Sequence, residues 1–165
     1  MTRPKLDTTA LPQGDTRLLR DPIAQRLLHS SELARLGYVA IDGTPRVIPI
    51  GFLWTGAEVI TATFQGSPKI RALRKRPNVA VTIDRPGMPP EVLTLRGTVT
   101  IEDVDGVPKE YRQMQERYYG AEHADATVAA LEEGGARMAR LILRPTWVGV
   151  LDFQTRLPSA LSGAA

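Results

Sequence analysis

Three residues, Ser67, Lys69 and Arg71, have the types and spacing of a phosphate-binding site at the start of a short helix. Ser67 followed by Pro68 is typical of an N-cap and a first helical turn, so a helix is predicted to begin at about Pro68. The unpaired N–H groups and the positive dipole end of a helix N-terminus attract an anion. Two nearby cations would add charge-assisted hydrogen bonds to a phosphate.

Two other interpretations of this helix stay open. The helix also carries Arg74, Lys75 and Arg76 with no acidic residue among them, and Pro77 is expected to end it. A short basic helix is commonly a solvated face. A nucleic-acid contact is disfavoured, because no aromatic residues alternate with the cations and the net charge is only +3.

A β-hairpin is predicted to position this helix. Val47 to Trp54 and Val59 to Phe64 are short, rich in β-branched and aromatic residues, and separated by the turn at Thr55 to Glu58. Leu33 to Ile41, followed by an Asp-Gly turn, is expected to precede them as a third strand of a meander.

The remaining elements predict a small antiparallel barrel with attached helices, of class α+β and mainly β. Tyr111, Met114, Gln115 and Tyr118 are expected to share one side of a helix. Further strands are predicted at 79–84 and 92–101, one or two closing strands between 138 and 150, and helices at 22–30, 107–119 and 124–133.

Several classes of chemistry lack their residues. The chain has no cysteine, and the GxGxxG, GxxxxGK[ST] and GxSxG patterns do not occur. His29 and His123 stand far apart, outside any metal-ligand spacing, so no metal site is expected and haem ligation by either histidine is a minor alternative. No catalytic acid or base can be assigned. Redox chemistry would therefore need a bound organic cofactor.

The stretch from Ile41 to Asp84 resembles the flavin-binding split barrel of the pyridoxamine phosphate oxidase-like superfamily, and in particular its deazaflavin-dependent oxidoreductase branch. The resemblance is carried by Gly43 to Pro45, the strand from Val47 to Trp54, the Thr61 and Thr63 pair, and the Ser-x-Lys-x-Arg-x-Leu motif from Ser67 to Leu73. It implies a six-stranded antiparallel split β-barrel.

The resemblance also implies a cofactor site at the interface of a homodimer. The cofactor would be FMN or a deazaflavin coenzyme of the F-420 type. In the family pattern, the backbone of the first strand lines the ring, the threonines reach the ribityl chain, and the Ser-x-Lys-x-Arg residues hold the phosphate. A tryptophan of the last strand would cover the ring from the partner subunit, with a core tryptophan near a strand end as the open alternative. These positions correspond to Val47, Ile48, Pro49, Thr61, Thr63, Ser67, Lys69, Arg71 and Trp147.

The expected organisation is an N-terminal arm over 1–20, a flavin-binding split-barrel domain over 21–155 and a C-terminal tail over 156–165, both ends being flexible. No membrane-spanning run or signal peptide is recognised, so a cytoplasmic location is expected. The chain end lacks the Arg-x-His element with which pyridoxamine phosphate oxidases hold their substrate, so vitamin B6 oxidation is not expected.

Two functions remain in competition. The first is an oxidoreductase that transfers hydride or electrons from FMN or a deazaflavin to a small organic acceptor. The second is a binding protein without turnover that carries flavin, haem or a tetrapyrrole. The sequence does not distinguish FMN from the deazaflavin, because both carry a phosphate and a similar tricyclic ring.

Overall fold

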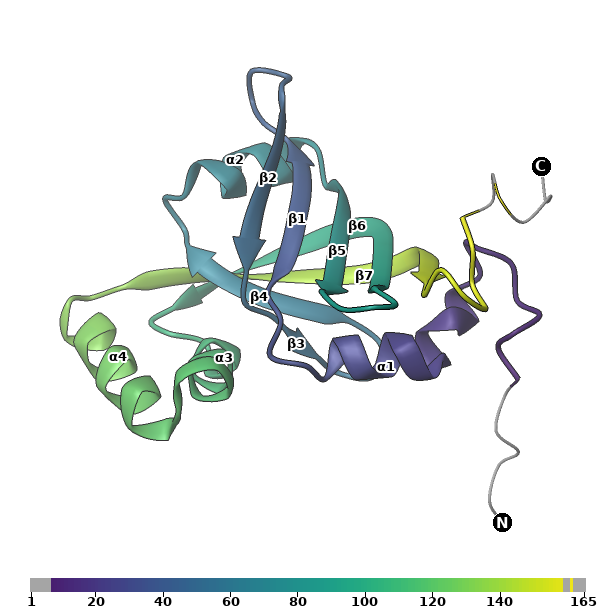
Figure 1. Cartoon of the computed structure of the whole chain (residues 1–165). Helices are drawn as coiled ribbons and strands as arrows, with labels where there is room; N and C mark the ends of the chain where they lie inside the picture. Colours follow the sequence, from purple (N-terminus) through teal and green to yellow (C-terminus); the bar gives the residue numbers. More distant parts are fainter. Residues whose placement is uncertain (1–6, 159–160, 162–165) are drawn as a thin grey trace, which may run out of the picture.

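The computed structural model describes residues 7–158 and 161, and its centre is a seven-stranded antiparallel sheet (Figure 1). The strands are β1 (Ala34–Val39), β2 (Pro45–Ile50), β3 (Leu53–Trp54), β4 (Val59–Phe64), β5 (Asn78–Arg85), β6 (Glu91–Asp105) and β7 (Arg137–Leu151). Their order in the sheet is β2-β1-β5-β6-β7-β4-β3. The predicted class, mainly β with attached helices, is confirmed.

The predicted count of six strands is wrong, because the expected strand from Val47 to Trp54 is two strands. It is interrupted at Gly51 and Phe52, where the Phe52 side chain enters the core with none of its surface exposed. β2 pairs along its whole length with β1, and only the two residues of β3 pair with β4. The expected meander through β2 and β4 therefore does not form.

The interruption between β2 and β3 forces the sheet to curl. β2 and β3 are the two outer strands of the sheet, yet only Gly51 and Phe52 separate them in the chain. The Cα atoms of Ile50 and Leu53 can then be at most ~11 Å apart, since an extended chain spans about 3.6 Å per residue. The sheet must curl until its edges approach each other, although they do not pair.

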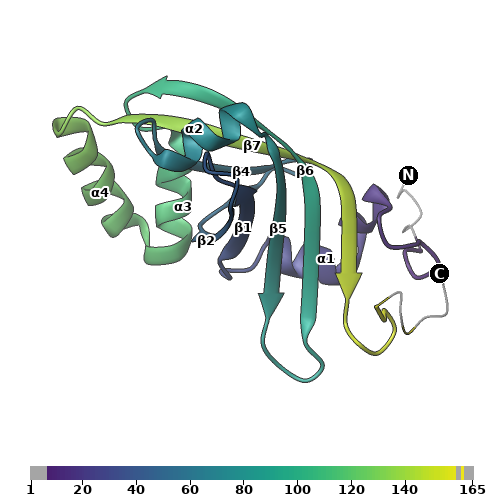
Figure 2. The same ribbon diagram turned by 90° about the horizontal axis from the view of Figure 1, so that it is seen from above.

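Two long strands, β6 and β7, run through both halves of the curled sheet (Figure 2). Their pairing shifts at a bulge between Arg96 and Gly97. A Cβ at Gly97 would collide with the Arg144 carbonyl, so a glycine permits the close approach of the two strands at this bend.

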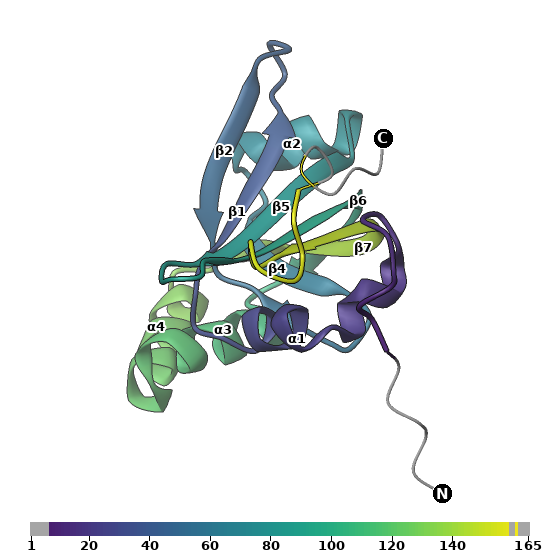
Figure 3. The ribbon, with the colours of Figure 1, turned by 45° about the vertical axis from the view of Figure 1, so that its right-hand side comes forward.

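Two helices cover the ends of the barrel, and two others form an extension on one side (Figures 1 and 3). α1 (Pro22–Leu28) and α2 (Pro68–Lys75) cover opposite ends of the barrel, and α2 begins at the predicted residue. α3 (Lys109–Tyr119) and α4 (Ala121–Glu133) form a hairpin inserted between β6 and β7. A 3₁₀ turn, η1 (Thr16–Arg20), precedes α1. None of these helices is long and apolar enough to cross a membrane.

The core lies inside the curled sheet and under α1 and α2. Alternate residues of β5 and β6 point into it, as the strand period requires. Its most enclosed side chains include Leu27, Leu28, Phe52, Leu73, Val81, Ile83, Leu93, Leu95, Leu141 and Val148.

The described parts of the two terminal segments pack against each other. Leu18 is part of the core, and the Asp21 carboxylate accepts hydrogen bonds from the Thr8 hydroxyl at 2.8 Å and from Arg156 Nε at 2.9 Å. All three polar residues are buried. We refer to Thr8, Asp21 and Arg156 as the terminal clamp. The proposed boundaries at residues 20 and 155 stay predictions, and residues 1–6, 159–160 and 162–165 of the expected flexible ends lie outside the described part.

Candidate functional site

The start of α2 is built as the sequence predicts. Ser67 has the extended N-cap conformation, with φ −62° and ψ 135°, and Pro68 occupies the first turn. The Ser67 hydroxyl makes no capping hydrogen bond within the described residues, so it can donate to a ligand instead. The helix N-terminus here combines a free hydroxyl with the positive dipole end.

Lys69, in the first turn of α2, is a half-buried cation without a carboxylate partner among the described residues. Burial lowers the pKa of its ammonium group below the ordinary value of 10.5, and no ion pair counteracts this shift. Buried charges in proteins are normally paired. The position of Lys69 therefore costs free energy in the unliganded chain, and an anion would offset that cost.

Lys69 lines a pocket of about 220 Å³ together with residues from two strands. Pro49 contributes from β2 and Gly51 from the residue that follows this strand, and Thr61 and Ala62 contribute from β4. We refer to this space as the Lys69 pocket. It brings together three of the predicted site residues, Pro49, Thr61 and Lys69.

The opposite wall of the Lys69 pocket is the inward side of α3, formed by Tyr111, Met114, Gln115, Tyr118 and Tyr119. Four of these residues were predicted to share a helix side. Their role as a pocket wall was not predicted, because it depends on where the inserted α3 and α4 hairpin docks. Helix periodicity specifies a side but not its partner.

Arg117 and Tyr118 fix α3 against the barrel. The Arg117 guanidinium donates to the backbone carbonyls of Leu28, at 3.2 Å, of Ser30, and of Phe52, at 3.2 Å. The Tyr118 hydroxyl donates to the Glu32 carbonyl at 3.2 Å. Burial raises the pKa of the Tyr118 phenol, so it stays protonated and can keep this bond.

The space next to Gly51 is filled by an aromatic ring. A Cβ at this glycine would lie 3.1 Å from the Tyr118 ring, closer than most real contacts. The interruption between β2 and β3 thus allows α3 to approach the end of β2.

Four other residues predicted to bind the cofactor do not line the Lys69 pocket. Thr63 lies two residues beyond Thr61, on the same face of β4. Arg71 is exposed, and two helix positions place it ~200° around α2 from Lys69. Ile48 packs against the core, whereas Val47 is 70% exposed.

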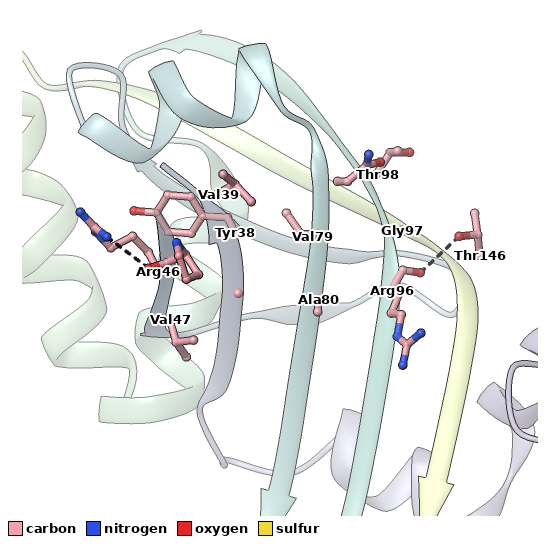
Figure 4. A pocket seen from close by; sticks show the side chains of 13 residues that line it. Tyr38, Val39, Arg46, Val47, Val79, Ala80, Arg96, Gly97, Thr98 and Thr146 are labelled. Carbon is pink, nitrogen blue, oxygen red and sulfur yellow. Dashed lines mark hydrogen bonds between the residues drawn. The ribbon is translucent and has the colours of Figure 1, made fainter. Parts of the chain in front are cut away.

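Val47 faces a second, apolar hollow on the outer face of the sheet (Figure 4). This hollow has a volume of about 520 Å³ and extends over β2, β1, β5 and β6. Tyr38, Val39, Val79 and Ala80 also line it, and Arg96 lies at its rim. We refer to it as the sheet-face hollow. Because β2 contributes Val47 to the hollow and Pro49 to the Lys69 pocket, the two sites are adjacent.

Trp147 lies elsewhere, in the part of β7 that pairs with Arg96. Its indole packs over Gly149, reaches Gly14 of the N-terminal segment, and has the Arg96 guanidinium 4.0 Å from its centroid. Thr61 pairs with Leu141, six residues back along β7, so Trp147 is ~20 Å along the strand from that level. Trp147 does not line the Lys69 pocket of its own chain.

Neither histidine lies in these sites. His29 is exposed at the end of α1, where its Nδ1 lies 2.8 Å from the Gln25 carbonyl. His123 is exposed on α4 and packs on the Tyr119 ring at 5.1 Å. Over residues 7–158, no group of three or more histidine and acidic side chains has metal-binding geometry.

Comparison with known proteins identifies the family of this chain. A sequence profile of the pyridoxamine 5'-phosphate oxidase family matches residues 21–151, most of the chain. The chain belongs to this family. The matched range begins at Asp21 and ends at Leu151, and so it contains the whole sheet and the Lys69 pocket.

Solved structures give the same fold. A protein described as an F420 reductase is 26% identical, with a TM-score of 0.60 over 76% of this chain and 94% of that one. A putative pyridoxamine 5'-phosphate oxidase from Listeria innocua is 17% identical, with a TM-score of 0.59 over 78% and 94%. The heme storage protein HutZ from Vibrio cholerae is 16% identical, with a TM-score of 0.60 over 79% and 93%. A comparison with curated protein sequences gives no match.

Proposed function

We propose that this family member is an oxidoreductase that binds FMN or a deazaflavin coenzyme beside α2. The single observation that carries the proposal is the half-buried, unpaired Lys69 at a helix N-terminus with a free Ser67 hydroxyl. This arrangement suits a phosphate, which both cofactors have. When bound, the flavin-type ring would supply hydride or electron transfer to a small organic acceptor.

In this proposal, the other predicted residues contact the ribityl chain, the ring and the phosphate of the cofactor. Thr61 and Thr63 lie on the β4 face next to the pocket, where their hydroxyls would reach the ribityl chain. The backbone from Val47 to Pro49 would line the ring. Arg71 is exposed on the other side of α2 from Lys69, so only its long side chain would bring a guanidinium to the phosphate. The chain's own residues thus bind and orient the cofactor, and no catalytic acid or base is assigned.

The proposal includes a homodimer that buries the sheet-face hollow. Members of this family are commonly dimers. An apolar hollow of this size with a 70% exposed valine is a candidate for such an interface. Because β2 borders both the hollow, through Val47, and the Lys69 pocket, through Pro49, a second copy seated on the hollow would complete the cofactor site. Trp147, beside Arg96 at the rim, would reach the partner's site rather than its own.

The dimer can be tested by sedimentation. We expect the wild-type protein to sediment as twice 18.1 kDa, and Val47→Glu to sediment as the monomer, since a carboxylate would be buried in an apolar interface. A wild-type monomer with a full complement of cofactor would overturn this part of the proposal.

Haem binding without turnover is the competing function, since HutZ shares the fold. The exposed positions of His29 and His123, away from the Lys69 pocket, do not favour it.

A parallel titration decides between them. Purified protein is titrated with FMN, with the deazaflavin coenzyme and with haem, and binding is followed by fluorescence and absorbance. Saturable binding of one flavin-type cofactor with no haem spectrum supports the proposal. A Soret band that is lost on His29→Ala or His123→Ala, with no flavin bound, contradicts it.

A further inference from the structure

The walls of the Lys69 pocket differ in charge. Lys69 is the only charged side chain among the described residues that line it. Every lining residue of α3 is neutral, and three of the five are tyrosines. If the cofactor phosphate pairs with Lys69, no cation of this chain remains in the lining for a second anion.

We propose that the α3 wall is an acceptor subsite for a small, flat, uncharged ring, such as a quinone. This inference rests on the proposed function, because it assumes that the cofactor phosphate occupies Lys69. A carboxylate, sulfonate or phosphate on the acceptor would be desolvated without a cation to pair with, which is costly. Tyrosine and methionine side chains, by contrast, stack favourably on flat apolar rings.

The wall is rigid enough to select a shape. Arg117 donates to three backbone carbonyls, and Tyr118 is held between Gly51 and the Glu32 carbonyl. Met114 is buried with 4% of its surface exposed, and so it anchors the middle of the wall. The whole Lys69 pocket, about 220 Å³, is below the ~300–1,000 Å³ of drug-sized pockets, and with the cofactor phosphate beside Lys69 it leaves room for one small ring system.

Gln115 is the residue that reports on the charge of this subsite. It is half-buried and lines the pocket, whereas Gln113, two positions earlier on α3, is exposed. Gln115→Lys would add a cation to the wall. Gln113→Lys adds the same charge to the same helix outside the pocket, and is the matched control.

The test measures binding to cofactor-loaded, oxidised protein, so that no turnover is needed. The two probes are 1,4-naphthoquinone and its anionic 2-sulfonate, followed by equilibrium dialysis and by the absorbance of the bound cofactor. We expect the neutral probe to bind at least ~10-fold more tightly in the wild type, because only the sulfonate is buried unpaired. Gln115→Lys should improve sulfonate binding ~10-fold, while Gln113→Lys changes either probe by less than ~2-fold.

The outcomes separate this inference from the proposed function. A protein that takes up no flavin-type cofactor contradicts the proposed function. A loaded protein that binds the sulfonate as tightly as the neutral probe, or binds neither, overturns the acceptor subsite alone. An equal response to Gln113→Lys and Gln115→Lys would likewise overturn it, because a general charge effect would then explain the change.

Discussion

The terminal clamp and the Lys69 pocket hold buried cations in opposite circumstances. Arg156 is 7% exposed and meets the Asp21 carboxylate, which is also buried, at 2.9 Å. Lys69 is half-buried and meets no carboxylate among the described residues. A buried cation that is fully paired within the chain serves the fold, whereas one left unpaired beside a pocket is available to a ligand. The comparison therefore contrasts a charge that the fold neutralises with one that only a ligand would neutralise.

The largest expected effect is the loss of the clamp. Arg156→Met should lower the free energy of unfolding by about 3–5 kcal/mol, because it leaves Asp21 buried and unpaired. Urea denaturation of the purified protein measures this. A loss below ~1 kcal/mol would show that the clamp is not a structural element.

Lys69→Met should weaken cofactor binding without lowering the stability of the fold. The free energy of unfolding of the cofactor-free protein should stay within ~0.5 kcal/mol of the wild type or rise, since a desolvated charge is removed. Cofactor binding should weaken by about 1–3 kcal/mol, the range of a lost charge-assisted hydrogen bond.

The matched control for this variant is Lys75→Met, an exposed lysine in the last turn of the same helix. It should leave cofactor affinity unchanged. Equal losses in the two variants would make the effect one of general charge, and the special role of Lys69 would be lost.

Asp152 is a carboxylate that the fold holds through hydrogen bonds, and its titration should make the stability of the fold depend on pH. Burial alone would raise the pKa of Asp152, but hydrogen bonds from Thr155 and from the backbone N–H groups of Arg156, Gln154 and Thr155 lower it from 3.8 to about 2. A lowered acid pKa stabilises the fold above about pH 4, and this stability is lost as the pH falls through about 2. The shift corresponds to about 2 kcal/mol.

Asp152→Asn should therefore be less stable than the wild type by about 2 kcal/mol at pH 7, and the difference should shrink as the pH falls from 4 toward 2. Denaturation curves at several pH values measure it. A difference that does not change with pH would mean that the carboxylate charge is not what stabilises this turn.

The smallest effect is expected for an exposed pair. Arg17 and Asp15 are 2.6 Å apart, but the Arg17 side chain is 59% exposed. Arg17→Met should leave the midpoint of the same urea denaturation experiment nearly unchanged, because solvent screens the pair. A cost as large as that of Arg156→Met would remove burial as the reason for the clamp's stability.

Local signals predicted much of this molecule. Ser67 and Pro68 located the start of α2, and alternation located β5 and most of β6. The interruption of the strand at Gly51 was missed, because the burial of Phe52 and the pairing of β2 with β1 depend on contacts distant in sequence.

The candidate site was predicted in part for the same reason. Lys69 and Thr61 follow from short motifs. The docking of α3 depends on Arg117, whose carbonyl partners are 65 to 89 residues away in the chain. The terminal clamp joins residues 135 positions apart, and no local sequence pattern predicts such a contact.

The most direct test of the central claim is a cycle that removes the phosphate and the lysine separately. Affinities are measured for FMN and riboflavin, and for the deazaflavin coenzyme and its phosphate-free core, with the wild type and with Lys69→Met. The wild type should prefer the phosphorylated member of one pair by about 5–150-fold, and Lys69→Met should lose most of that preference. A phosphate preference that survives Lys69→Met unchanged would contradict the assignment of this pocket.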